Sequence, residues 1–163
     1  MRRVTSMRRP RGKGLTTIEL LAALGVLMVL ATVAIPLKHW DEKRRREEHL
    51  RISLRMMRGA IDQYKRYADE GRIQMSDVDQ RGFPRELDEL VEGVDLSDPS
   101  GGETKKVRLL HRVPIDPFTG DTEWGLRSYQ DDWDATSWGG ENVWDVYSLA
   151  PGKALDGTYY KDW

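Results

Sequence analysis

The sequence predicts an α+β protein in which one long N-terminal helix packs on a small antiparallel β-sheet. The first observation is an apolar run at residues 20–37 that continues into a charged and then amphipathic stretch, as one long helix requires. The second is a C-terminal half in which short strand-like segments alternate with loops rich in Gly and Pro. The length of 163 residues suits one modest domain after any targeting segment is set aside.

Charge is distributed unevenly along the chain. Residues 1–14 contain six of the 26 Lys and Arg residues and no acid, which leaves 20 basic against 27 acidic residues, a net charge of −7, in the remainder. A protein of this sign is a poor nucleic-acid binder. No nucleic-acid partner is therefore predicted.

The apolar run at residues 20–37 is long enough to cross a membrane. A helix from Leu15 to Pro36 would extend roughly 33 Å at about 1.5 Å per residue, against a hydrocarbon core of about 30 Å. Basic residues lie on both sides of the run, so their count favours a cytoplasmic N-terminus only narrowly. The run predicts a spanning helix or a secretory signal.

Glu19 lies at the start of this run and has two interpretations. A carboxylate carried to the centre of a bilayer costs about 2.5 to 3.5 kcal/mol, so Glu19 is expected near an edge or beside a partner. Since Glu19 is only five residues beyond Gly14, it could also lie among head groups as an ordinary interfacial residue. The residues alone leave both interpretations open.

Residues 38–70 predict a continuation of the helix. The stretch 38–49 has no apolar face, but it contains acid–base pairs at a spacing of four and no Gly, Pro or Ser, which favours a solvated helix over a disordered linker. Beyond it, apolar residues recur at spacings of three and four, and they are Leu50, Leu54, Met57, Ile61, Tyr64 and Ala68. This stripe is predicted to pack on a sheet formed by the rest of the chain, with a coiled-coil seam as the alternative.

Residues 71–163 predict a globular half with one short helix and a few strands. The helix is expected at Glu86 to Val91, and the Asp-, Pro-, Ser- and Gly-rich residues 97–103 are expected to form a loop. Strands are expected within 123–129 and 143–149. Between them, residues 130–140 predict a solvated loop with Trp anchors, and cation binding by its carboxylates is the alternative.

No catalytic motif is found in the chain. The absence of Cys excludes disulfides, thiol catalysis and thiolate metal sites. The three histidines, His39, His49 and His111, share no metal-ligand spacing, and there is no Gly-x-Ser-x-Gly elbow or phosphate-binding loop. The chain is therefore not expected to be an enzyme.

The N-terminal residues resemble the precursors of type IV pilins and type II secretion pseudopilins. The segment Lys13-Gly14-Leu15-Thr16-Thr17-Ile18-Glu19 matches a basic leader, its terminal Gly and a Glu fifth after it. Pro36 falls where family members commonly carry a helix-kinking proline, whereas Leu15 departs from the more usual Phe or Met. The resemblance implies a pilin fold with four parts. Residues 1–14 would be a cleaved leader, 15–37 a transmembrane and filament-core helix, 38–70 its amphipathic continuation, and 71–163 a globular α+β periplasmic domain.

The resemblance also implies processing and assembly. A prepilin peptidase would cut between Gly14 and Leu15 and methylate the new amino terminus. Glu19 would then pair with the terminal amine of a neighbouring subunit, because opposite charges attract strongly in a helix bundle of low dielectric constant. The implied partners are further copies of the chain in a helical filament, the prepilin peptidase, minor pseudopilins and the inner-membrane assembly platform.

Two C-terminal segments resemble the major, G-type pseudopilins. They are the Pro-x-Asp-Pro turn within residues 109–120 and the Tyr-Ser pair followed by an Asp-containing loop at residues 146–163. In that family the loop holds a structural calcium ion, which implies Asp156 and Asp162 as candidate ligands here. A turn without metal at Asp156-Gly157 explains the same residues and remains the alternative.

Taken together, the resemblance implies a structural subunit of the type II secretion pseudopilus. Such a subunit crosses the inner membrane once, holds its globular domain in the periplasm and polymerises into a filament that drives export of folded proteins. The alternatives are a type IV pilin or minor pilin for adhesion or DNA uptake, and a signal-anchored periplasmic binding domain.

Overall fold

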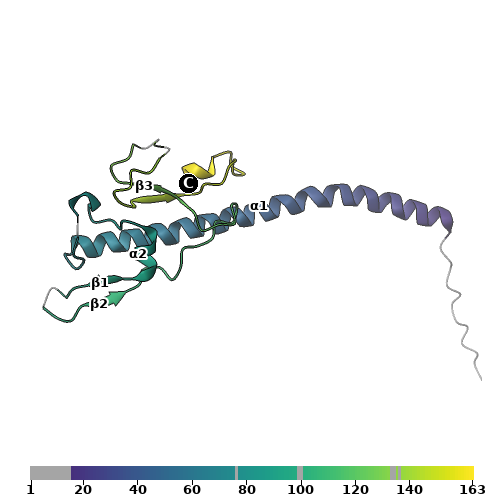
Figure 1. The fold of residues 1–163 in the computed structure, drawn as a ribbon. Helices are drawn as coiled ribbons and strands as arrows, with labels where there is room; N and C mark the ends of the chain where they lie inside the picture. Colours follow the sequence, from purple (N-terminus) through teal and green to yellow (C-terminus); the bar gives the residue numbers. More distant parts are fainter. Residues whose placement is uncertain (1–15, 76, 99–100, 133–134, 136) are drawn as a thin grey trace, which may run out of the picture. The chain divides into compact units, whose positions relative to one another are not determined.

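The computed structural model describes residues 16–163 except 76, 99–100, 133–134 and 136, and it leaves the side chains of residues 32–38 undescribed. The chain divides into two compact units, Met1–Asp41 and Glu42–Trp163. The fold is α+β, as predicted, with a long helix that packs on two small antiparallel sheets (Figure 1). The elements are α1 (Thr17–Asp69), η1 (Val78–Gln80), α2 (Leu87–Glu92), β1 (Val94–Leu96), β2 (Lys105–Val107), β3 (Gly125–Arg127), β4 (Asp145–Tyr147) and η2 (Tyr160–Asp162).

Helix α1 is continuous over 53 residues, and both of its ends have a local cause. At the start, the hydroxyl of Thr16 accepts a hydrogen bond from the backbone N–H of Glu19 at 3.3 Å, which is the geometry of an N-cap. At the end, Gly71 adopts φ of 68° and the N–H of Arg72 donates to the carbonyl of Tyr67 at 2.9 Å. The predicted end of the helix near residue 70 is confirmed.

Among the residues that the structure describes, no helix is both long and apolar enough to cross a membrane. The apolar run predicted at residues 20–37 extends into residues 32–38, whose side chains lie outside the description.

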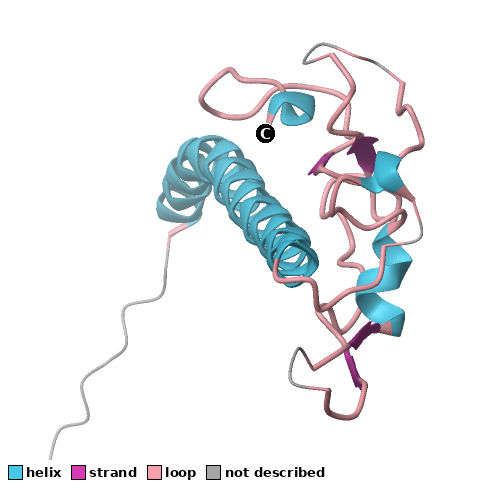
Figure 2. Cartoon of the chain, turned by 90° about the vertical axis from the view of Figure 1, so that its left-hand side faces the viewer, coloured by secondary structure: helices cyan, strands magenta, loops and turns pink. Residues whose placement is uncertain are grey.

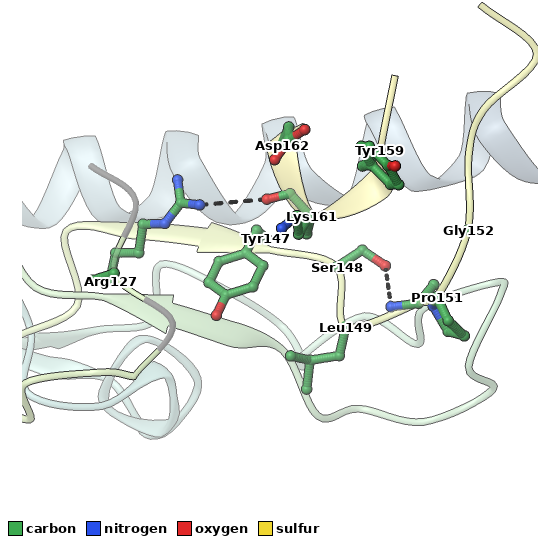
Figure 3. A pocket seen from close by; sticks show the side chains of 11 residues that line it. Arg127, Tyr147, Ser148, Leu149, Pro151, Gly152, Tyr159, Lys161 and Asp162 are labelled. Atoms are coloured by element: carbon green, nitrogen blue, oxygen red, sulfur yellow. Dashed lines mark hydrogen bonds between the residues drawn. The ribbon is translucent and has the colours of Figure 1, made fainter. Parts of the chain in front are cut away.

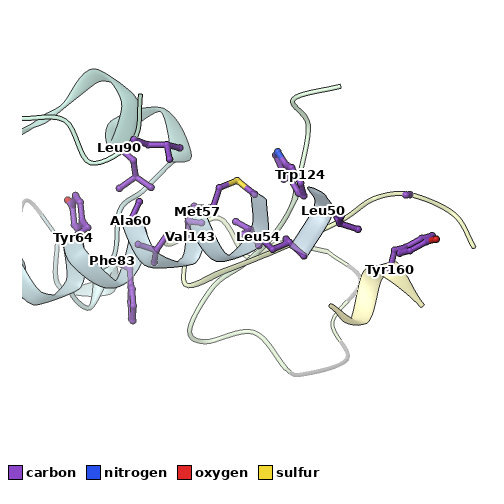
Figure 4. Packing of buried hydrophobic residues seen from close by; sticks show 14 of the residues in the cluster. Leu50, Leu54, Met57, Ala60, Tyr64, Phe83, Leu90, Trp124, Val143 and Tyr160 are labelled. Carbon is purple, nitrogen blue, oxygen red and sulfur yellow. The ribbon is translucent and has the colours of Figure 1, made fainter. Parts of the chain in front are cut away.

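The apolar stripe of α1 forms the centre of the core, as predicted. Leu50, Leu54, Met57, Ile61 and Tyr64 are all at least 96% buried, and Ala68 packs against them. The residues that share this core come from several later segments of the unit Glu42–Trp163, and Figure 4 shows Phe83, Leu90, Trp124, Val143 and Tyr160 among them. The others include Leu96, Leu110 and Val146. The stripe therefore packs on the rest of its own unit.

The β-structure consists of two separate hairpin-like pairs instead of the single small sheet that was predicted (Figure 2). Strands β3 and β4 pair antiparallel with Gly125 opposite Tyr147, inside the two segments where strands were expected. Strands β1 and β2, with Val94 opposite Val107, were not predicted. They are three residues each and carry three charged residues between them, too short a pattern to show alternation.

The loop between β3 and β4 is tied down by Asn142, which is fully buried. Its side-chain oxygen accepts from the N–H of Tyr129 at 3.0 Å, and its amide donates to the carbonyl of Asp79 at 3.0 Å. Its backbone carbonyl accepts from the indole N–H of Trp138 at 2.9 Å. Of the two predicted Trp anchors, Trp138 makes this local hydrogen bond but is exposed, and Trp133 lies outside the described residues.

Candidate functional site

The N-terminal part of α1 has an apolar surface on every side. The five consecutive residues from Val26 to Leu30 are each 60–66% exposed, and successive side chains of a helix are rotated by about 100°. Ile18, Leu20, Leu21 and Leu24 extend the same surface toward the N-terminus. A helix that is apolar all round is normally buried in a bilayer or among other helices.

Glu19 is the one acidic residue of this surface among the described residues 16–31. It lies in the first turn of α1, where the helix dipole favours a negative charge, and it is exposed. Thr16 and Glu19 also have the spacing of a capping box, and the Thr16 hydroxyl makes its half of that motif. Glu19 is therefore placed either to support the helix end or to meet a charge from outside the chain.

The remaining residues predicted for processing and assembly are described only in part. Gly14 and Leu15 lie outside the described residues. Pro36 lies within α1, and its side chain lies outside the description. The predictions for these three residues stay predictions.

Asp156, a predicted calcium ligand, is engaged by protein donors on both carboxylate oxygens. Its Oδ1 accepts from the hydroxyl of Thr158 at 2.6 Å and from the Thr158 N–H at 3.0 Å, and its Oδ2 accepts from Arg51 at 3.1 Å. The hydrogen bonds from Thr158, helped by the Arg51 guanidinium, hold the pKa of Asp156 below its ordinary value. These contacts are those of an Asx turn that is closed by Gly157 at φ of 89°.

Asp162, the second predicted ligand, lies in η2 and lines a groove beside the end of β4, whereas Asp156 does not line that groove. The described residues contain no group of three or more His, Cys, Asp or Glu side chains that could hold a metal ion. A guanidinium beside Asp156 also opposes a cation at that carboxylate. The arrangement favours the metal-free turn, the alternative that the sequence left open, and the melting experiment in the Discussion tests it against calcium binding.

Charged residues along one side of α1 hold the C-terminal segment, residues 150–163. Lys43 donates to the carbonyl of Lys153 at 2.7 Å, Glu47 accepts from the N–H of Leu155 at 2.8 Å, and Arg51 pairs with Asp156. Positions 43, 47 and 51 recur at the helical spacing of four, so they share one side of the helix. Sequence reasoning missed this role because charged residues at that spacing are also typical of a solvated helix.

Lys43, Glu47 and Arg51 form a polar ladder along α1. Glu47 is buried within this ladder, contrary to the prediction that residues 38–49 are solvated. Only 8% of its surface is exposed, and its Oε1 accepts from both the N–H of Leu155 and the hydroxyl of Tyr160 at 3.1 Å. Burial, with the hydrogen bond to Glu47, raises the pKa of Tyr160 to about 12. The carboxylate thus supplies the polar partners of a backbone N–H and a Tyr hydroxyl that the core would otherwise leave unpaired.

Arg58 extends the ladder to the last residue of the chain. Its guanidinium donates to both oxygens of Asp145, at 2.6 and 3.2 Å, and to the carbonyl of Trp163 at 2.6 Å. The Arg51 guanidinium lies over the Trp163 ring, 4.2 Å from the centroid of the ring. The indole N–H of Trp163 donates to the Thr158 hydroxyl at 2.7 Å. Strand β4 and the C-terminal segment are therefore fixed to α1 by the same side chain.

The Pro-x-Asp-Pro turn is organised by Asp116, which is fully buried. Its carboxylate accepts from the N–H of Phe118 at 2.7 Å and from the hydroxyl of Ser148. That hydroxyl in turn accepts from the N–H of Ala150 at 3.0 Å. The turn is thus joined to the Tyr-Ser pair at the end of β4, two segments that the sequence presented separately.

A groove of about 650 Å³ lies between the end of β4 and the C-terminal segment (Figure 3). Arg127 donates to the carbonyl of Lys161 at 3.4 Å along this groove, and its guanidinium lies over the Tyr147 ring. Tyr159, Lys161 and Asp162 also line it. Ser148 lines the groove as well, and its hydroxyl accepts from the N–H of Ala150 and donates to Asp116.

Comparisons with protein-family models, curated proteins and solved structures gave no match for this chain.

Proposed function

We propose that the chain is a structural subunit of a filament, the type II secretion pseudopilus, processed by a prepilin peptidase and assembled through its N-terminal helix. The observation that carries the proposal is the all-round apolar surface of α1 at residues 18–30, interrupted among the described residues only by the acidic Glu19. The leader motif that ends at Gly14 supports the same conclusion.

The apolar surface supports both stages of such a function. Burying a side chain of the size of Leu or Val stabilises by about 1.5 to 3 kcal/mol, so exposing this helix to water is strongly unfavourable. A bilayer would bury the helix of the precursor, and the helices of neighbouring subunits would bury it in the filament. Residues 15–37 then form the membrane and filament-core segment of a pilin fold, with the globular unit in the periplasm.

Glu19 determines the register in which neighbouring subunits assemble. Cleavage after Gly14 would create a free amino terminus four residues before Glu19 on the new chain. An amine and a carboxylate attract strongly where water is excluded, and either of them alone is costly there. Pairing of Glu19 with the amine of a neighbour therefore selects one register among many that apolar contacts alone allow.

The polar contacts within the globular unit also support a structural role. Its polar clusters, formed by Glu47, Arg58, Asp116 and Asn142, join elements of the fold to one another. The proposed partners are further copies of this chain, the prepilin peptidase, minor pseudopilins and the assembly platform of the inner membrane. A type IV pilin or minor pilin and a simple anchored domain are the alternatives, and the test below distinguishes the anchored domain from a filament subunit.

The experiment is a set of substitutions that separates the two roles open to Glu19. Glu19→Gln keeps a side chain that can complete a capping box and removes the charge, whereas Thr16→Ala removes the cap and keeps the charge. We expect Glu19→Gln and Glu19→Ala to be processed normally and to form few or no filaments. Thr16→Ala is expected to assemble nearly as the unmodified chain does.

Filament yield is measured by shearing and sedimentation, and processing by the mass of the membrane-extracted chain. Normal filaments from Glu19→Gln, together with a defect in Thr16→Ala, would assign Glu19 to the helix cap and refute charge pairing. A chain that is never processed would leave the simple anchored domain as the function.

A further inference from the structure

Charge is strongly segregated within the globular unit. Residues 43–58 of α1 contain seven Lys or Arg and two acids, one of which is the buried Glu47. Residues 86–98, which include α2 and β1, contain six acids and no Lys or Arg. The unit thus carries a basic stretch on α1 and an acidic one on α2 and β1, although Lys105 and Lys106 of β2 lie beside β1. Opposite charges of this kind steer copies of one chain toward each other.

The basic surface contains a groove of about 450 Å³, lined by Arg51, Leu54, Arg55, Arg58 and Trp163. Arg58 is occupied by Asp145 and Trp163, and Arg51 by Asp156. The described hydrogen bond of Arg55 is a local one, from Nε to the carbonyl of Arg51 at 3.3 Å. Arginine around a partly buried indole is typical of a protein-binding hot spot, and Arg55, which is exposed, retains donors for a carboxylate.

The acidic surface is presented by the outer side of α2. Asp88 and Glu92 are both exposed and lie four residues apart on one side of the helix. Leu90, between them, is fully buried and packs in the core, which fixes their side as the outer one. Asp95 on β1 is also exposed, but it lies opposite Lys106 of β2, so the acidic surface is that of α2.

We infer that the Arg55 groove of one subunit receives the acidic α2 surface of a second copy of this chain, with Arg55 paired to Glu92 or Asp88. The inference rests on the proposed function, since it assigns a contact between globular units of the filament. The groove and α2 are different surfaces, so each copy offers one to a neighbour on either side. Such a contact is heterologous and can repeat along a filament without closing.

Cross-linking tests this contact directly, because the chain contains no Cys. The full chain is produced with a prepilin peptidase as the variant Arg55→Cys, Glu92→Cys, and its filaments are treated with a short bismaleimide. A heterologous contact that repeats predicts a ladder of dimers, trimers and higher multimers. Each single-Cys variant is expected to remain monomeric, and so is the control pair Arg55→Cys, Glu123→Cys, which places the second thiol on an exposed acid of another segment.

Charge reversal gives a second readout that does not depend on thiol geometry. Arg55→Glu or Glu92→Arg alone is expected to reduce filament yield at least tenfold at low salt, and the two together to restore most of it. Glu123→Arg is the matched control and is expected to have no effect.

The outcomes separate this inference from the function on which it rests. If the unmodified chain forms no filaments, the proposed function fails and the inference fails with it. If it forms filaments while the paired variant gives no ladder and the reversals leave the yield unchanged, the filament stands and the contact is overturned. A ladder together with rescue by the double reversal establishes the contact.

Discussion

Glu47 is the residue whose environment differs most from what its sequence neighbourhood indicates. It lies among seven charged residues in the stretch 41–48, yet it is buried and holds Leu155 and Tyr160. The reason is that a backbone N–H and a hydroxyl of the C-terminal segment reach the core at this point and need an acceptor. No periodic pattern of apolar residues could reveal such a partner from a distance of about a hundred positions.

Removing this acceptor should weaken the docking of the C-terminal segment. Glu47→Ala removes the acceptor of the buried Tyr160 hydroxyl and of the part-buried Leu155 N–H, and we expect a loss of about 2 kcal/mol in the free energy of unfolding. Glu47→Gln keeps an oxygen acceptor at the same place, so we expect less than half of that loss. Denaturant unfolding of the detergent-solubilised chain, followed by Trp fluorescence, measures both.

Glu48→Ala is the control for this pair of variants, since Glu48 is the exposed neighbour of Glu47. It is expected to change the unfolding free energy by less than 0.5 kcal/mol, as is usual for surface positions (about ±0.5 kcal/mol). Equal effects of alanine at both positions would show that Glu47 acts only as one charge among many.

At the scale of elements, sequence patterns identified the long periodic parts and missed the short ones. The stripe from Leu50 to Ala68 was predicted correctly because five turns of helix repeat the same spacing. Strands β3 and β4 were located within segments of seven residues, although only three residues of each are paired. Strands β1 and β2 were missed because Lys105 and Lys106 hide the pattern of a strand that has only three residues.

The C-terminal segment gives a prediction at this scale. Because Asp156 is already engaged by Thr158 and Arg51, we expect chelation of calcium to leave the melting temperature of the chain unchanged. Asp156→Ala should lower the melting temperature equally with and without calcium, since it removes the turn and the ion pair. Differential scanning fluorimetry with calcium or EDTA makes the comparison.

A rise in melting temperature on adding calcium that Asp156→Ala abolishes would instead establish Asp156 as a calcium ligand. The segment would then have to rearrange, with Arg51 leaving the carboxylate. In that case the polar ladder of Lys43, Glu47 and Arg51 would be only part of what holds the C-terminal segment to α1.

For the molecule as a whole, the same long helix serves two purposes along its length. Within the globular unit its apolar stripe is buried by the unit's own chain, and at residues 18–30 its apolar surface is exposed on all sides. The sequence was sufficient to predict this division, because composition and periodicity change near residue 38. It could not predict the contacts of Arg58 and Asn142, which depend on how distant loops meet.

The central claim is that the N-terminus is processed as in a prepilin, and the mass of the membrane-extracted chain tests it most directly. The chain is produced with and without a prepilin peptidase, and its intact mass and first residue are determined. We expect a start at Leu15, with or without a methyl group, only when the peptidase is present, and no such cleavage when Gly14 is replaced by a bulky residue. An intact N-terminus in the presence of the peptidase, or a start near Ile35, would show that the chain is not a prepilin.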